Sequence, residues 1–415
     1  MSITKSEKPV VGLVLIALIT AGVSCTLKDQ KTEETVPAEK GLIQLPRNTP
    51  KILLIQYVDE INGTWSFGNY WETYDTDVYN RTYADTLKKY LGIDLQMIPP
   101  SELIQGMDDV PEDKAEAMAD QWIREAEAVY EVEKEDIIKV GRMYLSVKKL
   151  LEKYDANAWS LRSWRVIDST LCMPPLAEMQ SYLDGVPTCC EGLIEPLVTQ
   201  MIGTYVSGRP GFIGDGLSYK MFEPKAGFEH PEDVIILGHC YIPVNPHGND
   251  QIPYVIRSHV YGNPNATVVQ QKHPAAPFVA NWAHWPVGER VTLVKFNVFE
   301  KAVAVFTGKI VDGDYYYQDF EETMCRDKLV VKVDDYQNCF MFPVTEGPES
   351  EGSPWRKFGR FGGHQVAFCG DYQAEIIELA ELIGFEVVTT EGVTENRGQQ
   401  AEGNIAEIIS EHIRL

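Results

Sequence analysis

Short apolar strands alternate with helices through the middle of the chain, and this alternation constrains the fold more than any other feature. Apolar runs at 51–58, 158–167, 186–191, 211–215 and 233–239 are typical of buried strands. Helical patterns separate several of them, at 111–153, 174–183 and 193–205. Strands that alternate with helices predict an α/β fold with Rossmann-like parallel sheets and helices on the sheet faces.

The pattern changes after residue 290. Alternating segments at 291–296, 302–307 and 328–333, separated by Gly and Asp, indicate antiparallel strands in a barrel-like or sandwich-like domain. The domains that we predict are a signal peptide (1–24), a disordered tether (25–48), an N-terminal α/β domain (49–165), a central α/β domain (166–289) and a C-terminal β-rich, barrel-like domain with closing helices (290–415).

The first 25 residues are typical of a targeting segment. Lys5 and Lys8 precede an apolar run, 9–24, that is short for a membrane span, and small residues stand just before Cys25. This favours a lipoprotein signal with a lipid anchor at Cys25, and therefore a cell-envelope location, periplasmic or at the outer surface. A plain secretory signal and a cytoplasmic protein are the alternatives. The polar stretch 26–38 fits a tether.

Charge and cysteine usage exclude some functions. The 415-residue chain has a formal net charge of −24 and no basic stripe, which argues against binding to nucleic acid. Its eight cysteines are scattered without a C-x-x-C pair, so a zinc ribbon is not expected and buried free thiols are the default interpretation.

Polar side chains stand at the ends of three successive strand candidates. Glu191 ends the first, Asp215 the second and His239 the third. Because the carboxyl ends of parallel strands share one edge of a sheet, we expect these side chains to lie together. Carboxylates with imidazoles suit Mn²⁺, Fe²⁺, Co²⁺ or Zn²⁺. Each residue also has an ordinary structural explanation, such as a helix cap or a packed histidine.

A fourth candidate, His364, follows two glycines just before the apolar run 365–369, where it could approach a ligand closely. The stretch 123–372 resembles the L-fucose isomerase and L-arabinose isomerase superfamily, and most closely its fucose isomerase-like branch. The resemblance is carried by VGRMYLSVKKLL (140–151), GVPTCCE (185–191), LVTQMIGTYVSGRPGF (197–212), GHC (238–240), IRSH (256–259), VTLVKF (291–296), GH (363–364) and GDY (370–372).

The resemblance implies a metal site and a reaction. Glu191, Asp215 and His364 match the three ligands that bind Mn²⁺ in these isomerases, and His239 matches an additional His ligand of the arabinose enzyme. The implied activity is metal-dependent aldose–ketose isomerisation through an enediol, an intramolecular oxidoreduction. Either Glu191 or Asp215 would be the catalytic base. The N-terminal α/β portion is short for the family, and a secretory signal is unusual in it.

Arg257 and His259 are candidates for binding the hydroxyl groups of a sugar, or else an ordinary loop pair. The expected partners are a small sugar, a membrane only through Cys25, and further copies of the chain in a homo-oligomer. The alternative function is a membrane-anchored lipoprotein that binds a sugar or sugar-like ligand without turning it over. The sequence names neither the sugar nor the metal.

Overall fold

The computed structural model describes residues 49–56, 76–162, 164–217, 221–231, 233–248, 250–259, 278–322, 325–335, 361, 363–394 and 401–413. The predicted signal peptide, the lipid anchor at Cys25 and the whole predicted tether lie outside these residues. Among the described helices, none combines the length and the apolar character that a membrane crossing requires.

A small parallel sheet organises the first part of the chain. Its strands stand in the order β2-β1-β4-β5, with parallel pairing throughout. Their bounds are β1 Lys51–Ile55, β2 Asp94–Ile98, β4 Ala158–Leu161 and β5 Thr188–Cys190. The helices between them are α1 Thr76–Leu91, α2 Pro100–Asp108, α3 Glu112–Glu125, α4 Lys134–Tyr154, α5 Trp164–Thr170 and α6 Pro175–Leu183. The predicted α/β class is confirmed.

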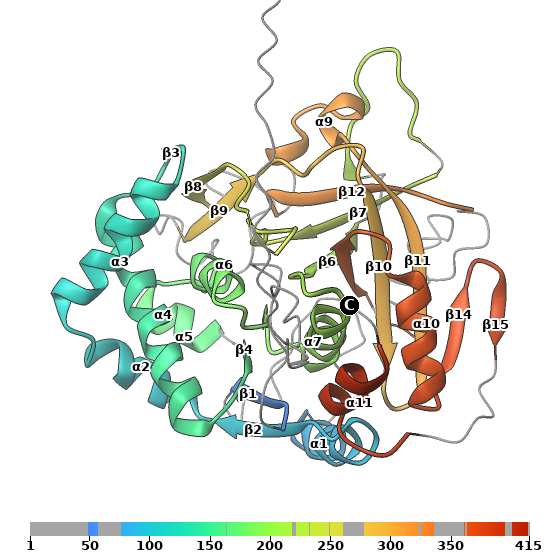
Figure 1. Cartoon of the computed structure of the whole chain (residues 1–415). Helices are drawn as coiled ribbons and strands as arrows, with labels where there is room; N and C mark the ends of the chain where they lie inside the picture. Colours follow the sequence, from blue (N-terminus) through green and yellow to red (C-terminus); the bar gives the residue numbers. More distant parts are fainter. Residues whose placement is uncertain are drawn as a thin grey trace, which may run out of the picture. The chain divides into compact units, whose positions relative to one another are not determined.

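A larger mixed sheet holds most of the remaining strands (Figure 1). Within it, β10, β13, β6, β7, β12 and β11 pair antiparallel in that order, and β11 pairs again with β10, so this series of pairings closes on itself. The bounds are β6 Phe212–Leu217, β7 Val234–His239, β10 Arg290–Asn297, β11 Ala302–Val311, β12 Asp327–Val333, β13 His364–Cys369, β14 Glu386–Thr389 and β15 Gly392–Thr394.

A third small sheet and several further helices complete the described elements. Strands β3, β8 and β9 form a third small sheet. Their bounds, with those of the other elements, are β3 Ala128–Val129, β8 Tyr254–Ser258, β9 Val279–Ala283, α7 Ile194–Ser207, α9 Gly313–Tyr316, η3 Phe320–Glu322, α10 Gln373–Leu382 and α11 Ile405–His412.

One part of the predicted topology is wrong. The sequence predicted that the strands at 186–191, 211–215 and 233–239 are parallel neighbours in one sheet. Instead β5 belongs to the small sheet, whereas β6 and β7 belong to the large sheet and run antiparallel to each other. The large sheet therefore crosses the domain boundary predicted at 289–290. Hydrophobic periodicity identifies a strand but does not say which sheet it joins, and no described helix separates β6 from β7.

Helix α7 joins the two sheets. It contacts β4 and β5 on one side and β6, β10 and β13 on the other (Figure 1). Every residue of this helix except Glu195 is buried, which explains why its sequence is apolar all round rather than along one stripe. Residues of α7 share one apolar core with Ile52 and Leu54 of β1 and with Val294 and Val366 of the large sheet.

We expect Leu197→Ala in α7 to lower the free energy of unfolding by about 2–5 kcal/mol, because the side chain is fully buried and its removal leaves a cavity between the sheets. The control is Val393→Ala in β15, whose side chain is exposed. Urea unfolding followed by circular dichroism measures both. Equal midpoints for the two variants would contradict this role of α7.

Candidate functional site

The backbone turns sharply between β5 and α7, at Glu191 and Gly192. Both residues adopt left-handed conformations, with φ of 69° and 71°. This conformation costs a non-glycine residue roughly 1–2 kcal/mol, and such strain clusters at functional sites. A side chain at position 192 would also collide with Arg162, since an added Cβ would lie 2.7 Å from the Arg162 Cβ. The turn therefore fixes Glu191 at the end of β5.

Asp215 and His364 meet across two neighbouring strands. Asp215 of β6 and His364 of β13 are directly opposite each other in the strand register. The His364 Nε2 lies 2.8 Å from the Asp215 Oδ1. Both side chains keep some solvent access, at 13% and 21% relative exposure. On the other edge of β6, Asp215 pairs with Gly238, the residue before His239. The large sheet thus brings together three of the predicted residues by antiparallel register.

A buried lysine supports this pair. The Lys295 Nζ donates a hydrogen bond of 3.0 Å to the backbone carbonyl of His364 and lies 3.8 Å from the Glu195 carboxylate. Lys295 is only 2% exposed. Burial lowers its pKa, and the Glu195 carboxylate opposes that shift. Lys295 thereby helps to fix the strand that carries His364.

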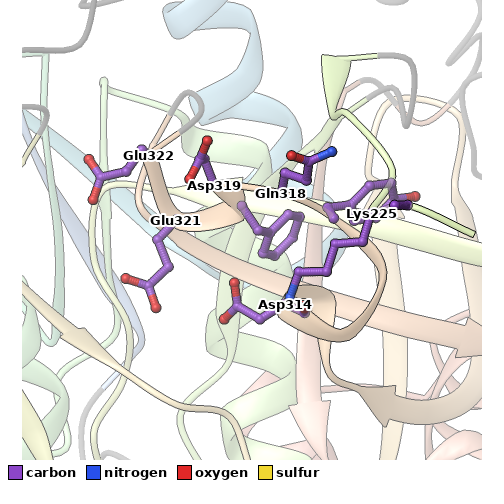
Figure 2. Close-up of a pocket in the computed structure, with 9 residues that line it drawn as sticks. Lys225, Asp314, Gln318, Asp319, Glu321 and Glu322 are labelled. Carbon is purple, nitrogen blue, oxygen red and sulfur yellow. Dashed lines mark hydrogen bonds between the residues drawn. The ribbon is translucent and has the colours of Figure 1, made fainter. Parts of the chain in front are cut away.

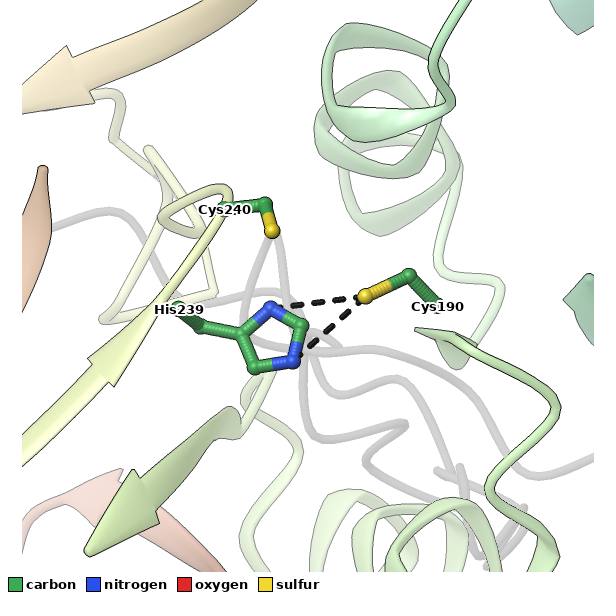
Figure 3. A group of neighbouring side chains, drawn as sticks. All are labelled: Cys190, His239 and Cys240. Atoms are coloured by element: carbon green, nitrogen blue, oxygen red, sulfur yellow. Dashed lines mark hydrogen bonds between the residues drawn. The ribbon is translucent and has the colours of Figure 1, made fainter. Parts of the chain in front are cut away.

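His239 is buried beside Cys190. Its two ring nitrogens lie 3.4 and 3.5 Å from the Cys190 Sγ, and Figure 3 shows the ring between Cys190 and Cys240. The His239 and His364 rings are 5.8 Å apart between centroids. Burial lowers the pKa of His239 to about 3, against the attraction of the Asp215 carboxylate, so the imidazole is neutral and free of charge at neutral pH.

The electrostatics of Glu191 differ from those of an ordinary surface carboxyl. Burial and then the nearby Asp215 carboxylate raise its pKa to about 7, while His364 and Arg162 act in the opposite direction. A carboxyl with this pKa exists in both protonation states near neutral pH. It can therefore accept and return a proton under physiological conditions.

Glu178 of α6 is a functional candidate that the sequence reasoning missed. Its side chain is fully buried, and neither carboxyl oxygen has a hydrogen-bond partner within the described residues. Burial and then the charge of Glu191 raise its pKa well above the ordinary value, which favours the neutral form of this carboxyl next to the site. The signal in the sequence was a single acid in the otherwise uncharged segment 174–183.

The described residues contain two trios whose metal-binding atoms all lie within 4.8 Å of one another: Cys190, His239 and Cys240, and Cys240, His259 and Cys325. Glu191, Asp215 and His364 are not such a trio. They are electrostatically coupled neighbours, but a side chain must rotate before all three could hold one ion. The metal set inferred from the resemblance stays a prediction.

The two predicted sugar-binding residues are engaged with protein groups. Arg257 forms ion pairs with Glu131, Glu321 and Glu322 at 3.6, 3.3 and 3.3 Å. His259 follows β8, is only 1% exposed and lies with Cys240 and Cys325. In this conformation neither side chain is presented to a solvent-borne ligand, and their binding role also stays a prediction.

A pocket of about 610 Å³ lies beside the ion pairs of Arg257. Figure 2 shows several carboxylates and Lys225 around it. Burial raises the pKa of both Asp314 and Glu321 in its lining. Most of the charged groups in the lining are carboxylates, so the pocket is acidic, although Arg257 neutralises part of this charge. Its lining residues are Lys225, Ala226, Asp314, Tyr317, Gln318, Asp319, Phe320, Glu321 and Glu322.

Comparison of the chain with protein-family models gives no match, and comparison with curated proteins gives none either. The resemblance to the sugar isomerases therefore depends on the motifs quoted above.

The raised pKa of Glu191 predicts how stability depends on pH in the metal-free chain. Between about pH 4.5 and pH 7 the folded state keeps a proton that the unfolded chain has lost, so stability falls as pH rises through this window. Glu191→Gln removes the ionisation. At pH 8, with chelator present, we expect this variant to be more stable than the wild type by on the order of 1–3 kcal/mol.

At pH 5 the difference should be much smaller, and urea unfolding at both pH values measures it. The matched control is Glu411→Gln, whose side chain is 70% exposed and should show no such dependence. The assignment is contradicted if the stability gain of Glu191→Gln over the wild type is smaller at pH 8 than at pH 5.

Proposed function

We propose that the protein is a divalent-metal-dependent aldose–ketose isomerase acting on a small sugar, with Glu191, Asp215 and His364 at its centre. The observation that carries the proposal is the direct pairing of Asp215 with His364 beside a carboxyl, Glu191, whose pKa is about 7. Supporting it is the ordered set of motifs that resembles the sugar isomerases.

The chemistry of the donor set fits a metal ion such as Mn²⁺. Adjacent ligands of an octahedral ion with bonds of about 2.1 Å are about 3.0 Å apart. The Asp215 Oδ1 and His364 Nε2 are separated by 2.8 Å, close to such an edge. Glu191 would supply a third ligand after a rotation of its side chain, and the neutral imidazole of His239 offers a fourth. Such an ion would polarise two adjacent oxygens of the sugar.

In the proposed mechanism Glu191 moves the proton. Its carboxylate form would take the proton from carbon two of the aldose, and its acid form would return that proton at carbon one. The proton of the hydroxyl group on carbon two would pass to the oxygen on carbon one, which gives the ketose. Of the two carboxyls left open by the sequence, Glu191 is the better supported base because its pKa matches the operating pH. Asp215 is held by His364 and is better suited to orient ligands. The raised pKa of Glu178 disfavours a second negative charge beside Glu191.

The second candidate function is sugar binding without turnover. It is favoured by two observations: among the described residues, the ligand atoms of Glu191, Asp215 and His364 do not all lie within 4.8 Å of one another, and protein partners occupy Arg257. We retain for both functions the proposal of an envelope lipoprotein anchored at Cys25, with the chain itself assembling as a homo-oligomer.

The test combines metal content with isomerase assays on a panel of aldoses and ketoses. We expect about one Mn²⁺ per chain after loading, and turnover of at least one sugar. Asp215→Asn and His364→Ala should lose the metal. Glu191→Gln should lower kcat by roughly 10²–10⁴-fold, the usual contribution of a general base. Chelator should abolish turnover, and Mn²⁺ should restore it.

Asp371→Asn is the matched control, because this carboxylate lies on the surface and pairs with Arg290 instead. Sugar binding with no turnover on any substrate would support the second candidate. Metal binding that is indifferent to Asp215→Asn and His364→Ala would reject the proposed centre for both functions.

A further inference from the structure

A second group of metal-binding side chains lies outside the carboxylate centre. Cys240 directly follows β7, His259 directly follows β8, and Cys325 stands two residues before β12. The three residues are far apart in the sequence and come from two different sheets, yet their metal-binding atoms lie within 4.8 Å of one another. Such convergence gathers two thiols and an imidazole at one point.

The spacing fits a tetrahedral ion. Two thiolates bound to one zinc ion at about 2.3 Å, with a tetrahedral angle between them, are about 3.8 Å apart. The Cys240 and Cys325 sulfurs are separated by 4.0 Å. A bound ion would therefore require only a small adjustment of these side chains.

Ordinary packing readily explains a lone buried cysteine, but it explains this trio of side chains less well. His259 is 1% exposed, and within the described part of the chain neither ring nitrogen makes a hydrogen bond of normal geometry, although the Cys325 thiol lies beside the ring. Buried imidazoles are normally hydrogen-bonded, because leaving them without partners is costly. A metal ion would use one of these nitrogens.

We propose that Cys240, His259 and Cys325 form a zinc site with three protein ligands and a fourth position for water or for the neighbouring Cys190. Thiolate and imidazole ligands select zinc over Mn²⁺, which prefers oxygen. This site is separate from the proposed carboxylate centre in its ligands and in its metal. The zinc proposal does not depend on the isomerase proposal.

Cobalt is the probe, because Co²⁺ bound to thiolates gives sulfur-to-metal charge-transfer absorption that oxygen ligands do not give. The full chain, reduced and freed of metal, is titrated with Co²⁺ without oxygen and then with Zn²⁺. We expect thiolate bands that saturate at about one ion per chain and disappear as Zn²⁺ displaces Co²⁺. Cys240→Ser and Cys325→Ser should remove the bands and weaken Zn²⁺ binding by roughly tenfold or more.

Two controls make the result specific. Cys369→Ser and Cys172→Ser change buried free cysteines outside the trio and should keep the bands. Asp215→Asn should keep them too, although it would damage the isomerase centre, so failure of one proposal is distinguishable from failure of the other. If Cys240→Ser does not fold, His259→Gln keeps both thiols and should still weaken Zn²⁺ binding by roughly tenfold or more. Three results overturn the proposal: absence of thiolate bands in the wild type, their unchanged persistence in Cys240→Ser or Cys325→Ser, or unchanged Zn²⁺ affinity in His259→Gln.

Discussion

Burial of α7 between two sheets is the constraint on which the described structure depends. The helix is apolar all round and packs against β4 and β5 on one side and β6, β10 and β13 on the other. The strand before the helix, β5, therefore belongs to the small sheet, and the strand after it, β6, belongs to the large sheet. Glu191 precedes the helix and Asp215 follows it, and the Asp215 carboxylate raises the cost of ionising Glu191. A helix with a charged face could not occupy this position without burying charge.

The sequence predicted the association of Glu191 with Asp215 for a reason that was partly wrong. It correctly identified a strand that ends beside Glu191 and a strand that contains Asp215. Asp215 lies inside β6 rather than at its end, because β6 continues to Leu217, and the two strands are not parallel neighbours in one sheet. The two strands belong to different sheets, and Asp215 meets His364 through the antiparallel register of β6 with β13. Register of this kind is set by long-range pairing across the whole large sheet, which local periodicity does not encode.

Other features were beyond sequence reasoning for similar physical reasons. The cysteines were correctly expected to be buried free thiols in most cases, but the meeting of Cys240 with Cys325 depends on the pairing of β7 with β12. The left-handed backbone of Glu191 gives no sequence signal, since that conformation favours glycine. Glu178 could have been found as a single acid in an uncharged helix, but its proximity to Glu191 comes from tertiary packing alone.

We propose that Asp215 and His364 form the fixed part of a divalent-metal centre that Glu191 completes. A crystal structure with Mn²⁺ bound, with anomalous scattering recorded, is the decisive measurement. We expect one anomalous peak within about 2.0–2.3 Å of the Asp215 Oδ1 and the His364 Nε2, with the Glu191 carboxylate turned toward it. A peak located only among the cysteines, or no peak beside Asp215 and His364, would rule this centre out.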